Sequence, residues 1–187
     1  MIRFANARLT VALLFAVLAT GATAAASSLV TPAVRDGHSD FNFLLGHWHT
    51  HYRLLRHRLV HDTLWLQCDG DSDVRPFWGT SADLQLGDLH CPPPRGYIQG
   101  MTLRIYDEKS RQWSLYFGSK ANGLDTPVVG HFMNGIGDFY ANDTEGGKPV
   151  LVRFRWAQRN GLPHFEQAES TDGGKTWEVD WISDYTR

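Results

Sequence analysis

The chain has 187 residues, of which 42% are hydrophobic and 12% aromatic, so it is long and apolar enough for one domain with a packed core. Basic and acidic residues are nearly balanced, at 18 Lys and Arg against 20 Asp and Glu, and no run of like charges occurs. A nucleic-acid partner is therefore not expected, because such proteins concentrate positive charge on one surface.

The first 26 residues have the layout of a secretory signal peptide. Arg3 and Arg8 precede an almost unbroken apolar run over residues 9–18, and small residues follow as far as Ala26. Cleavage fits after Ala24 or after Ala26. An uncleaved anchor is the alternative, but the apolar run is shorter than the roughly 20 residues that cross a bilayer. We therefore expect a periplasmic or secreted protein that has no membrane segment after cleavage.

Only two cysteines occur, Cys68 and Cys91, and no Cys-x-x-Cys redox spacing is present. In an exported chain an even number of cysteines favours a disulfide, because the compartment is oxidising. The alternative is two buried cysteines that act as small hydrophobic residues. A metal site is a weaker interpretation, because it would need two further ligands from elsewhere in the fold.

Residues 27–39 read as a polar leader, and a domain over residues 40–187 follows it with the turn signals of an all-β protein. Asn and Asp tolerate positive φ angles and Gly prefers them, so Asn-Gly and Asp-Gly pairs suit tight hairpin turns. Such pairs occur at Asn122-Gly123, Asn134-Gly135, Asn160-Gly161, Asp69-Gly70 and Asp172-Gly173. The segment from Cys91 to Gly96 is expected to be a loop, because three consecutive prolines cannot join a central sheet.

About ten short runs of alternating residues, rich in aromatic and β-branched types, predict the strands. They lie near residues 46–55, 63–68, 76–86, 99–107, 111–119, 127–133, 136–142, 149–157, 163–170 and 175–185. An antiparallel series of this length has exposed edges unless it closes on itself. The sequence therefore predicts a single up-and-down β-barrel of about 8–10 strands, with a β-sandwich as the alternative.

A short helical turn is expected before the first strand, capped by Ser39 or Asp40 and running as far as Gly46. The sequence Gly46-His47-Trp48 after such a turn resembles the Gly-x-Trp entrance of lipocalin-like, or calycin, barrels. In those barrels the Trp packs across the closed end.

Further motifs resemble, in the same order, an uncharacterised bacterial family of lipocalin-like barrels. They are the segments 100–107, 112–113, 130–132, 137–140, 153–156 and 170–181. The resemblance covers about residues 40–187 and implies the barrel fold, but it implies no particular chemistry. This chain departs from the usual pattern of that family at His47, His49, His131 and Glu169.

His47, His49 and His51 alternate along one expected strand and share a face, as metal ligands could. If Trp48 points into the barrel, however, Thr50 and Tyr52 do so as well, and the three histidines face solvent. We therefore expect an exposed strand face with incidental metal affinity, and no specific metal site.

The segment from Ser170 to Trp177 matches the Asp-box spacing of sialidase-like propellers, with Asp172, Gly174 and Thr176 at the other fixed positions. Propellers need several repeats of the motif, and one copy occurs here. The motif is interpreted as a turn-stabilising device that carries no evidence for glycan hydrolysis.

Aromatic interiors with a few polar groups typically line small-molecule cavities. Arg153 and Arg155 share one face of their strand, and Gln167 shares the face of Phe165 on the next. The candidate ligand-binding residues are Trp48, Tyr52, Arg153, Arg155, Gln167 and Trp181. The alternative for the two arginines is that they face solvent or stack on Trp48 at the barrel end.

No nucleophile, phosphate-loop or dinucleotide motif occurs in the sequence. The preferred function is binding of a small hydrophobic or aromatic molecule by an exported monomer or homodimer, without a cofactor. The first alternative is a cofactor-free isomerase, cyclase or lyase with Glu169 or His131 as the acid/base. The second alternative is haem binding through His131 or His164, which rests on a general likeness to haem-binding barrels.

Overall fold

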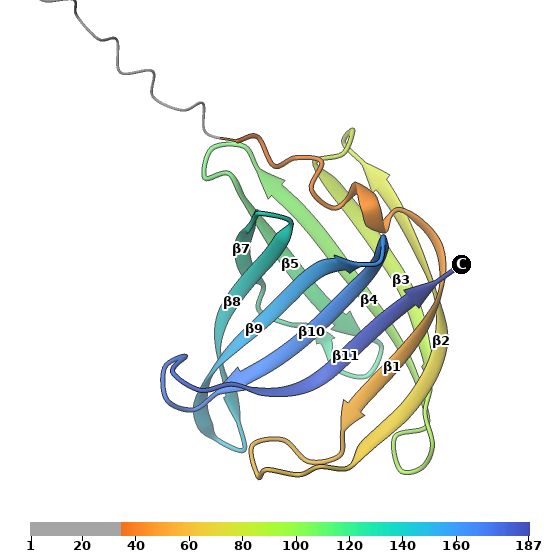
Figure 1. Cartoon of the computed structure of the whole chain (residues 1–187), viewed down its shortest axis with the longest axis vertical. Coiled ribbons are helices and arrows are strands. Elements are labelled where there is room, and N and C mark those ends of the chain that lie inside the picture. Colours follow the sequence, from red (N-terminus) through yellow and green to blue (C-terminus); the bar gives the residue numbers. More distant parts are fainter. Residues whose placement is uncertain (1–34) are drawn as a thin grey trace, which may run out of the picture. The chain divides into compact units, whose positions relative to one another are not determined.

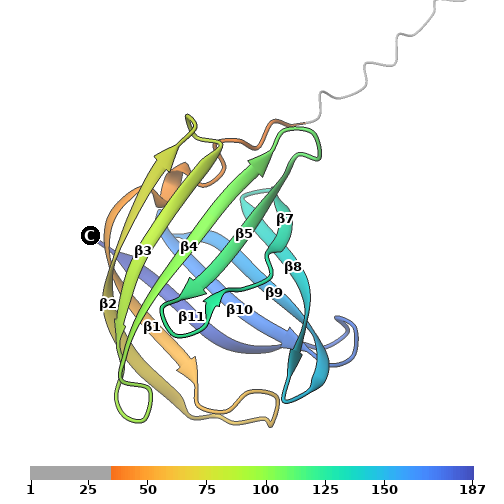
Figure 2. The same ribbon diagram turned by 180° about the vertical axis from the view of Figure 1, so that it is seen from behind.

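Ten antiparallel strands run up and down around a closed barrel in the computed structural model (Figure 1; Figure 2). The structure describes residues 35–187. The expected signal peptide and most of the 27–39 leader lie outside the described residues, so their processing stays a prediction.

Every strand of the barrel pairs with its neighbour along the chain, and β1 pairs with β11 to close the ring. The sandwich alternative is therefore wrong, because the ten long strands of the described chain form one continuous sheet. The two-residue β6 adds only a short pairing at the end of β5. The strands are β1 (Gly46–Leu55), β2 (Trp65–Phe77), β3 (Ala82–His90), β4 (Tyr97–Asp107), β5 (Gln112–Ser119), β6 (Gly123–Leu124), β7 (Val128–Met133), β8 (Ile136–Glu145), β9 (Lys148–Arg159), β10 (Leu162–Ser170) and β11 (Glu178–Thr186).

The expected helical turn is shorter than the sequence suggests. It is a 3-10 helix, η1 (Asn42–Leu44), and its N-cap is Phe41, with no side-chain capping bond. Asp40, an expected cap, instead accepts hydrogen bonds from Arg35. η1 lies at one end of the barrel (Figure 1), where Phe41 packs edge-on against Trp113 with ring centroids 5.0 Å apart.

Two of the expected Asn-Gly turns form tight hairpins. Asn134 and Gly135 both have positive φ angles between β7 and β8, and Asn160 and Gly161 do so between β9 and β10. This is the backbone that a type I′ hairpin requires.

The expected turn at Asp69-Gly70 is wrong, because both residues lie in the middle of β2. Gly70 is needed there for close approach: a Cβ on it would lie 1.8 Å from the Asp88 carbonyl oxygen of β3. The glycine of this Asp-Gly pair is therefore explained by the close approach of β2 to β3. The strands expected at 63–68 and 76–86 are replaced by β2 and β3, which have different bounds.

The Asp-box segment forms the turn between β10 and β11 that its spacing predicts. Asp172 accepts hydrogen bonds from the backbone N–H of Thr176 at 2.9 Å and of Lys175 at 3.0 Å. These bonds hold the pKa of Asp172 well below its ordinary value. Trp177 Nε1 donates to the Gly174 carbonyl at 3.0 Å, which anchors the ring over the turn.

Candidate functional site

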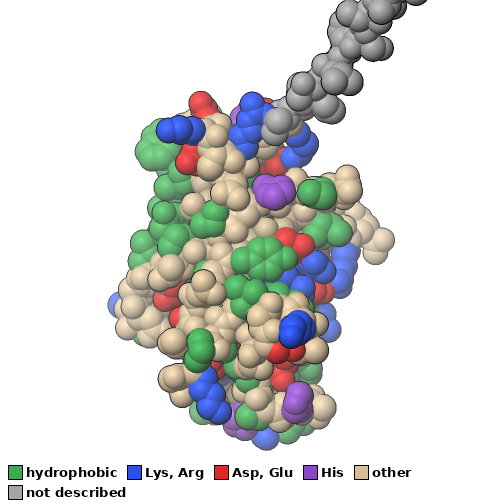
Figure 3. Space-filling view, turned by 90° about the vertical axis from the view of Figure 1, so that its left-hand side faces the viewer, with side chains coloured by type: hydrophobic (Ala, Val, Ile, Leu, Met, Phe, Trp, Pro, Cys, Tyr) green, Lys and Arg blue, Asp and Glu red, His purple; other side chains and the backbone are tan. Residues whose placement is uncertain are grey.

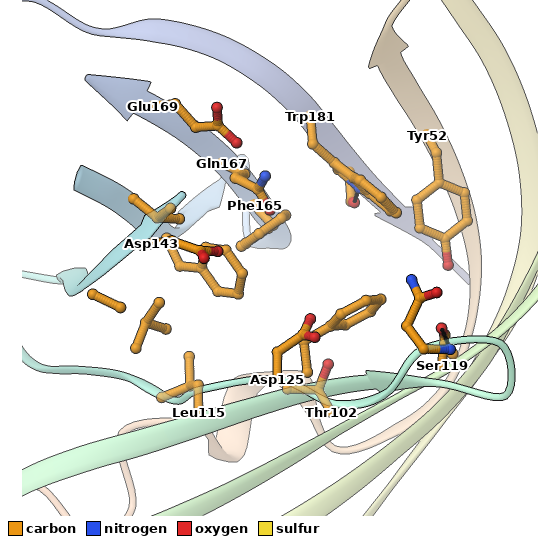
Figure 4. A pocket seen from close by; sticks show the side chains of 18 of the residues that line it. Tyr52, Thr102, Leu115, Ser119, Asp125, Asp143, Phe165, Gln167, Glu169 and Trp181 are labelled. Carbon is orange, nitrogen blue, oxygen red and sulfur yellow. Dashed lines mark hydrogen bonds between the residues drawn. The ribbon is translucent and has the colours of Figure 1, made fainter. Parts of the chain in front are cut away.

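A cavity of about 700 Å³ occupies the barrel interior, within the range of known small-molecule sites (Figure 4). Aromatic side chains close the barrel at the η1 end, where Phe41, Trp113, Phe132, Phe139 and Trp156 form one buried cluster. The cavity walls reach the opposite end, where the β1–β2 and β3–β4 loops contribute residues to the lining. The cavity is therefore a cup with one closed end.

One wall of this cup is apolar. It is built by inward-facing residues of β5, β7, β9 and β10, because alternate positions of each strand face the lumen. Its members are Leu115, Phe117, Val128, Val150, Val152, Phe154 and Phe165. Phe154 packs edge-on against Phe165 with centroids 5.2 Å apart, which fixes the two rings.

The opposite wall carries a connected set of polar side chains from β1, β2, β3 and β11. Gln85 Nε2 donates to the Tyr185 hydroxyl at 3.2 Å and to Ser72 Oγ at 3.3 Å. Tyr52 OH lies 3.3 Å from the same Ser72 Oγ. The cup therefore offers a ligand an apolar side and a side with hydrogen-bonding groups.

Arg104 is buried near the closed end and is fully shielded from solvent. Its guanidinium donates to Asp83 at 2.5 Å and to Gln85, and it lies 4.9 Å from the centre of the Trp156 ring. Burial raises the pKa of Asp83, and the charge of Arg104 opposes that rise. Arg104 therefore links Asp83 to Gln85 and holds Gln85 in place within the polar wall.

Two buried carboxylates lie near the mouth of the cup around Arg58. Arg58 donates to Glu169 Oε1 at 3.0 Å and lies 3.7 Å from Asp180 Oδ1. Gln167 also donates to Asp180 Oδ1, at 3.1 Å. The second oxygen of each carboxylate, Glu169 Oε2 and Asp180 Oδ2, is buried without a hydrogen-bond partner.

Burial opposes ionisation of both carboxylates, and the charge of Arg58 acts in the other direction. Burial raises the pKa of Glu169, against the opposing charge of Arg58. Burial raises the pKa of Asp180 to about 7, and the nearby negative charges of Glu169 and Glu178 add to this rise. The register shift between β10 and β11 occurs beside Asp180, which bulges its strand at this point.

Three of the six expected ligand-binding residues line the cavity: Tyr52, Gln167 and Trp181 (Figure 4). Trp48 is 3% exposed, as its expected inward orientation requires, but it does not line the cup. Its Nε1 donates to the Leu44 carbonyl at 2.7 Å at the η1 end. The arginine that stacks on it, 4.1 Å from its ring, is Arg187.

The expected interior placement of Arg153 and Arg155 is wrong, because the inward positions of β9 are Val152, Phe154 and Trp156. Arg155 instead bonds Asp138 of the neighbouring strand at 2.7 Å and 2.9 Å. Arg153 lies 4.6 Å from the centre of the Trp177 ring and covers the Asp-box turn. Of the alternative, in which the arginines face solvent or stack on Trp48, only the outward orientation describes these positions: both side chains are partly buried, and neither stacks on Trp48.

The two acid/base candidates lie on opposite sides of the barrel wall. Glu169 lines the cup, whereas His131 is exposed on the outer face of β7. Figure 3 shows exposed histidine and apolar side chains on the side of the barrel that includes β7 and β8. His164 is buried but does not line the cup, and it lies between Asp184 at 2.6 Å and Glu166 at 3.0 Å. Neither imidazole lines the cavity, so the alternative of haem held in the barrel interior by His131 or His164 does not fit the structure.

Cys68 and Cys91 form a disulfide with Cα atoms 4.4 Å apart. It ties β2 to the loop that follows β3, beside Leu89 of the cavity lining. The bridged alternative for the two cysteines therefore describes the structure, and its position near the mouth fixes one rim of the cup.

Sequence reasoning missed Gln85, Arg104, Arg58 and Asp180. The period-two pattern of β4 places Arg104 on the face opposite the apolar residues Met101 and Leu103, so the pattern gives no signal that this arginine is buried. Arg58 lies in the β1–β2 connection, where no periodicity exists to give it a direction.

In comparisons with known proteins, no protein-family model matches the chain and no curated protein sequence is significantly similar to it. The architecture of the barrel is consistent with calycin-like folds. Within residues 35–187, no helix has the length and apolar character needed to cross a bilayer.

Proposed function

We propose that this barrel binds a small, largely apolar or aromatic molecule in its interior and acts as a carrier or store for it. The observation that carries the proposal is the cup of about 700 Å³ with one apolar and one hydrogen-bonding wall. An antiparallel barrel of this size leaves room for one such ligand. The likeness of the sequence motifs to lipocalin-like barrels supports the same assignment.

Export to the periplasm or medium is part of the proposal. The signal-like first 26 residues and the Cys68–Cys91 disulfide both support an oxidising compartment.

The mouth of the cup gives the ligand an orientation. Glu169 Oε2 is buried without a hydrogen-bond partner, and such an oxygen is costly unless a donor meets it. A ligand with its apolar body against Phe117 and Phe165 and an amine or other donor toward Glu169 would satisfy this oxygen. The acids Asp125, Asp143 and Glu145 line the cavity together with the bases Arg56, Arg58 and Arg95, so Glu169 itself, and not the overall charge of the lining, gives the ligand its orientation.

Two probes of similar shape and opposite charge test the proposal: 1-naphthylmethylamine and the carboxylate 1-naphthaleneacetate. Binding is followed by the intrinsic tryptophan fluorescence, because Trp156 and Trp181 line the cup. The amine is expected to bind more tightly. Glu169→Gln should weaken the amine by about tenfold, the usual effect of losing one charged partner, and leave the carboxylate unchanged. Glu166→Gln, an acid on the same strand that does not line the cup, is the matched control. Failure of both probes to bind would overturn the proposal, and equal binding of both would overturn only the orientation.

A second candidate function is acid/base catalysis on such a ligand by Glu169. The raised pKa of Glu169 favours it, because a general acid works best when its pKa lies nearer to the working pH than that of an ordinary carboxyl group. In that case Glu169→Gln would leave ligand affinity nearly intact and lower turnover by about 10²–10⁴-fold. If the wild type shows no turnover and Glu169→Gln loses affinity, the protein is a carrier.

A further inference from the structure

The outer face of the barrel carries a ladder of histidines and aspartates that the cavity does not use. His47, His49 and His51 of β1 lie directly opposite Asp73, Asp71 and Asp69 of β2 in the strand register. All six side chains point away from the lumen, because the residues between them are the inward-facing ones. The sequence did not predict this ladder, because a turn was expected at Asp69-Gly70, where β2 continues.

Three members of the ladder converge on one point. The nearest ligand atoms of His49, His51 and Asp69 all lie within 4.8 Å of one another. His49 Nε2 lies 4.0 Å from Asp69 Oδ1. His51 Nδ1 is hydrogen-bonded to Asp69 Oδ1 at 2.5 Å, so an ion with bonds of about 2.0–2.2 Å replaces the proton between them and requires these two exposed side chains to move apart.

Asp71 orients the imidazole ring of His49. Its Oδ1 lies 3.2 Å from His49 Nδ1 and accepts a hydrogen bond from that nitrogen when it is protonated. This arrangement leaves Nε2, the nitrogen that faces Asp69, free to donate its lone pair. A carboxylate on the far nitrogen of a ligating imidazole is the usual support of a metal site in proteins.

The other neighbours are engaged elsewhere. Asp73, opposite His47, accepts a hydrogen bond from Arg75 at 2.6 Å. Asp184, opposite His51 on β11, accepts hydrogen bonds from Arg53 at 3.1 Å and is paired with His164. The site is therefore limited to His49, His51 and Asp69, with Asp71 behind.

We propose that His49, His51 and Asp69 bind a borderline divalent transition-metal ion, of the class of Zn²⁺, Ni²⁺ or Cu²⁺, on the outer face of the barrel. Two imidazoles and one carboxylate suit these ions and do not suit Mg²⁺ or Ca²⁺, which prefer all-oxygen sites. The three side chains are 48%, 52% and 60% exposed, so they have room to close around the ion. Three protein ligands leave a fourth position open to water or to an external ligand.

The test is calorimetric titration of the purified protein, carrying no polyhistidine tag, with ZnCl₂ and NiCl₂. One ion per chain is expected. His51→Ala and Asp69→Asn should each weaken binding at least tenfold, and Asp71→Asn by roughly 10–100-fold, the usual loss for a group that supports a ligand. His131→Ala is the matched control, because His131 is also exposed on an outer strand face but lies outside the cluster.

Spectra of the histidine ring nitrogens by NMR provide a second measurement that does not depend on the variants. Addition of one equivalent of Zn²⁺ should shift the ring signals of His49 and His51 and leave those of His131 and His164 unchanged. Equal affinity of wild type and His51→Ala would overturn the proposal, as would an equal loss in His131→Ala or ring shifts spread over all the histidines.

Discussion

Asp180 is a carboxylate held almost entirely out of solvent, at 1% exposure. Burial raises its pKa to about 7. Because this folded-state pKa lies above the unfolded one, the contribution of Asp180 to stability is full below about pH 4 and is lost as the pH rises through about 7. Asp180→Asn, which carries no charge at any pH, should therefore gain stability relative to wild type as the pH rises from 5 to 8.

Thermal unfolding midpoints at pH 5, 6.5 and 8 measure this difference for Asp180. Glu108→Gln, which removes an acid from the exposed turn after β4, should keep a nearly constant offset from wild type. A constant offset for Asp180→Asn as well would show that this carboxylate is ionised throughout the range.

Trp48 and His47 are adjacent residues whose side chains lie on opposite faces of β1. Trp48 is 3% exposed, donates to the Leu44 carbonyl and lies beneath Arg187, whereas His47 is exposed. Trp48→Ala should lower the free energy of unfolding by about 3–5 kcal/mol. His47→Ala should stay within about 0.5 kcal/mol of wild type. Urea denaturation measures both, and a comparable loss for the two variants would contradict the assignment of faces.

Periodicity predicted the faces of β1 correctly because it carried a marker, Trp48, for the inner side. In β9 the same rule also describes the structure, since Val152, Phe154 and Trp156 alternate with Arg153 and Arg155 and mark the inner face; the interior placement of the two arginines went against this pattern. In β3 the inward residues include Asp83 and Gln85, and their interior partner Arg104 lies on β4. A polar interior face is stable only through such cross-strand partners, which a single sequence does not display.

Strand β2 shows how a local signal is overridden by packing between strands. Asp69-Gly70 has the composition of a turn, but a continuous strand forms because Gly70 lets β2 approach the Asp88 carbonyl of β3. The other eight strands of the barrel could still be located approximately, and β1 with its correct bounds, because their apolar alternation and the turn signals agree.

Gly70→Ala should therefore destabilise the barrel although its backbone conformation is an ordinary one. A methyl group 1.8 Å from a carbonyl oxygen forces the two strands apart, which typically costs about 1–3 kcal/mol. Gly100→Ala is the control, because its nearest neighbour would lie 3.4 Å away, at ordinary contact distance. Equal stability of both variants in urea denaturation would show that close approach at Gly70 is not required.

The disulfide joins the end of the barrel to the proline-containing loop. Cys68 and Cys91 are 23 residues apart, and closing a loop of that length stabilises the folded state by roughly 3 kcal/mol on the chain-entropy account. The double variant Cys68→Ser, Cys91→Ser should lose stability of this order when compared with the oxidised wild type by urea denaturation. Two freely titrating thiols in the unfolded, unreduced wild type would contradict the bridge.

The closed ring of strands leaves the interior as the place where a small molecule can be surrounded by the protein. One end is filled by the aromatic cluster under η1, and the other is bordered by Arg58, Glu169 and the loop after Cys91. From the sequence, the candidate site could be predicted only as a type of cavity. Its polar residues come from strands and loops that lie far apart in the chain, and they come together only when the barrel closes.

Filling the cup is the most direct test of interior binding. Val128 and Val129 are neighbours on β7; Val128 is buried and lines the cavity, whereas Val129 is exposed on the outer face. The affinity for 1-naphthylmethylamine is measured for Val128→Trp and Val129→Trp, with thermal unfolding to verify that both fold, and with Val128→Phe if the larger ring prevents folding. The variant at Val128 is expected to bind the probe at least tenfold more weakly than wild type, whereas Val129→Trp should bind it like wild type. Unchanged binding in a folded Val128 variant would contradict a ligand site inside the barrel.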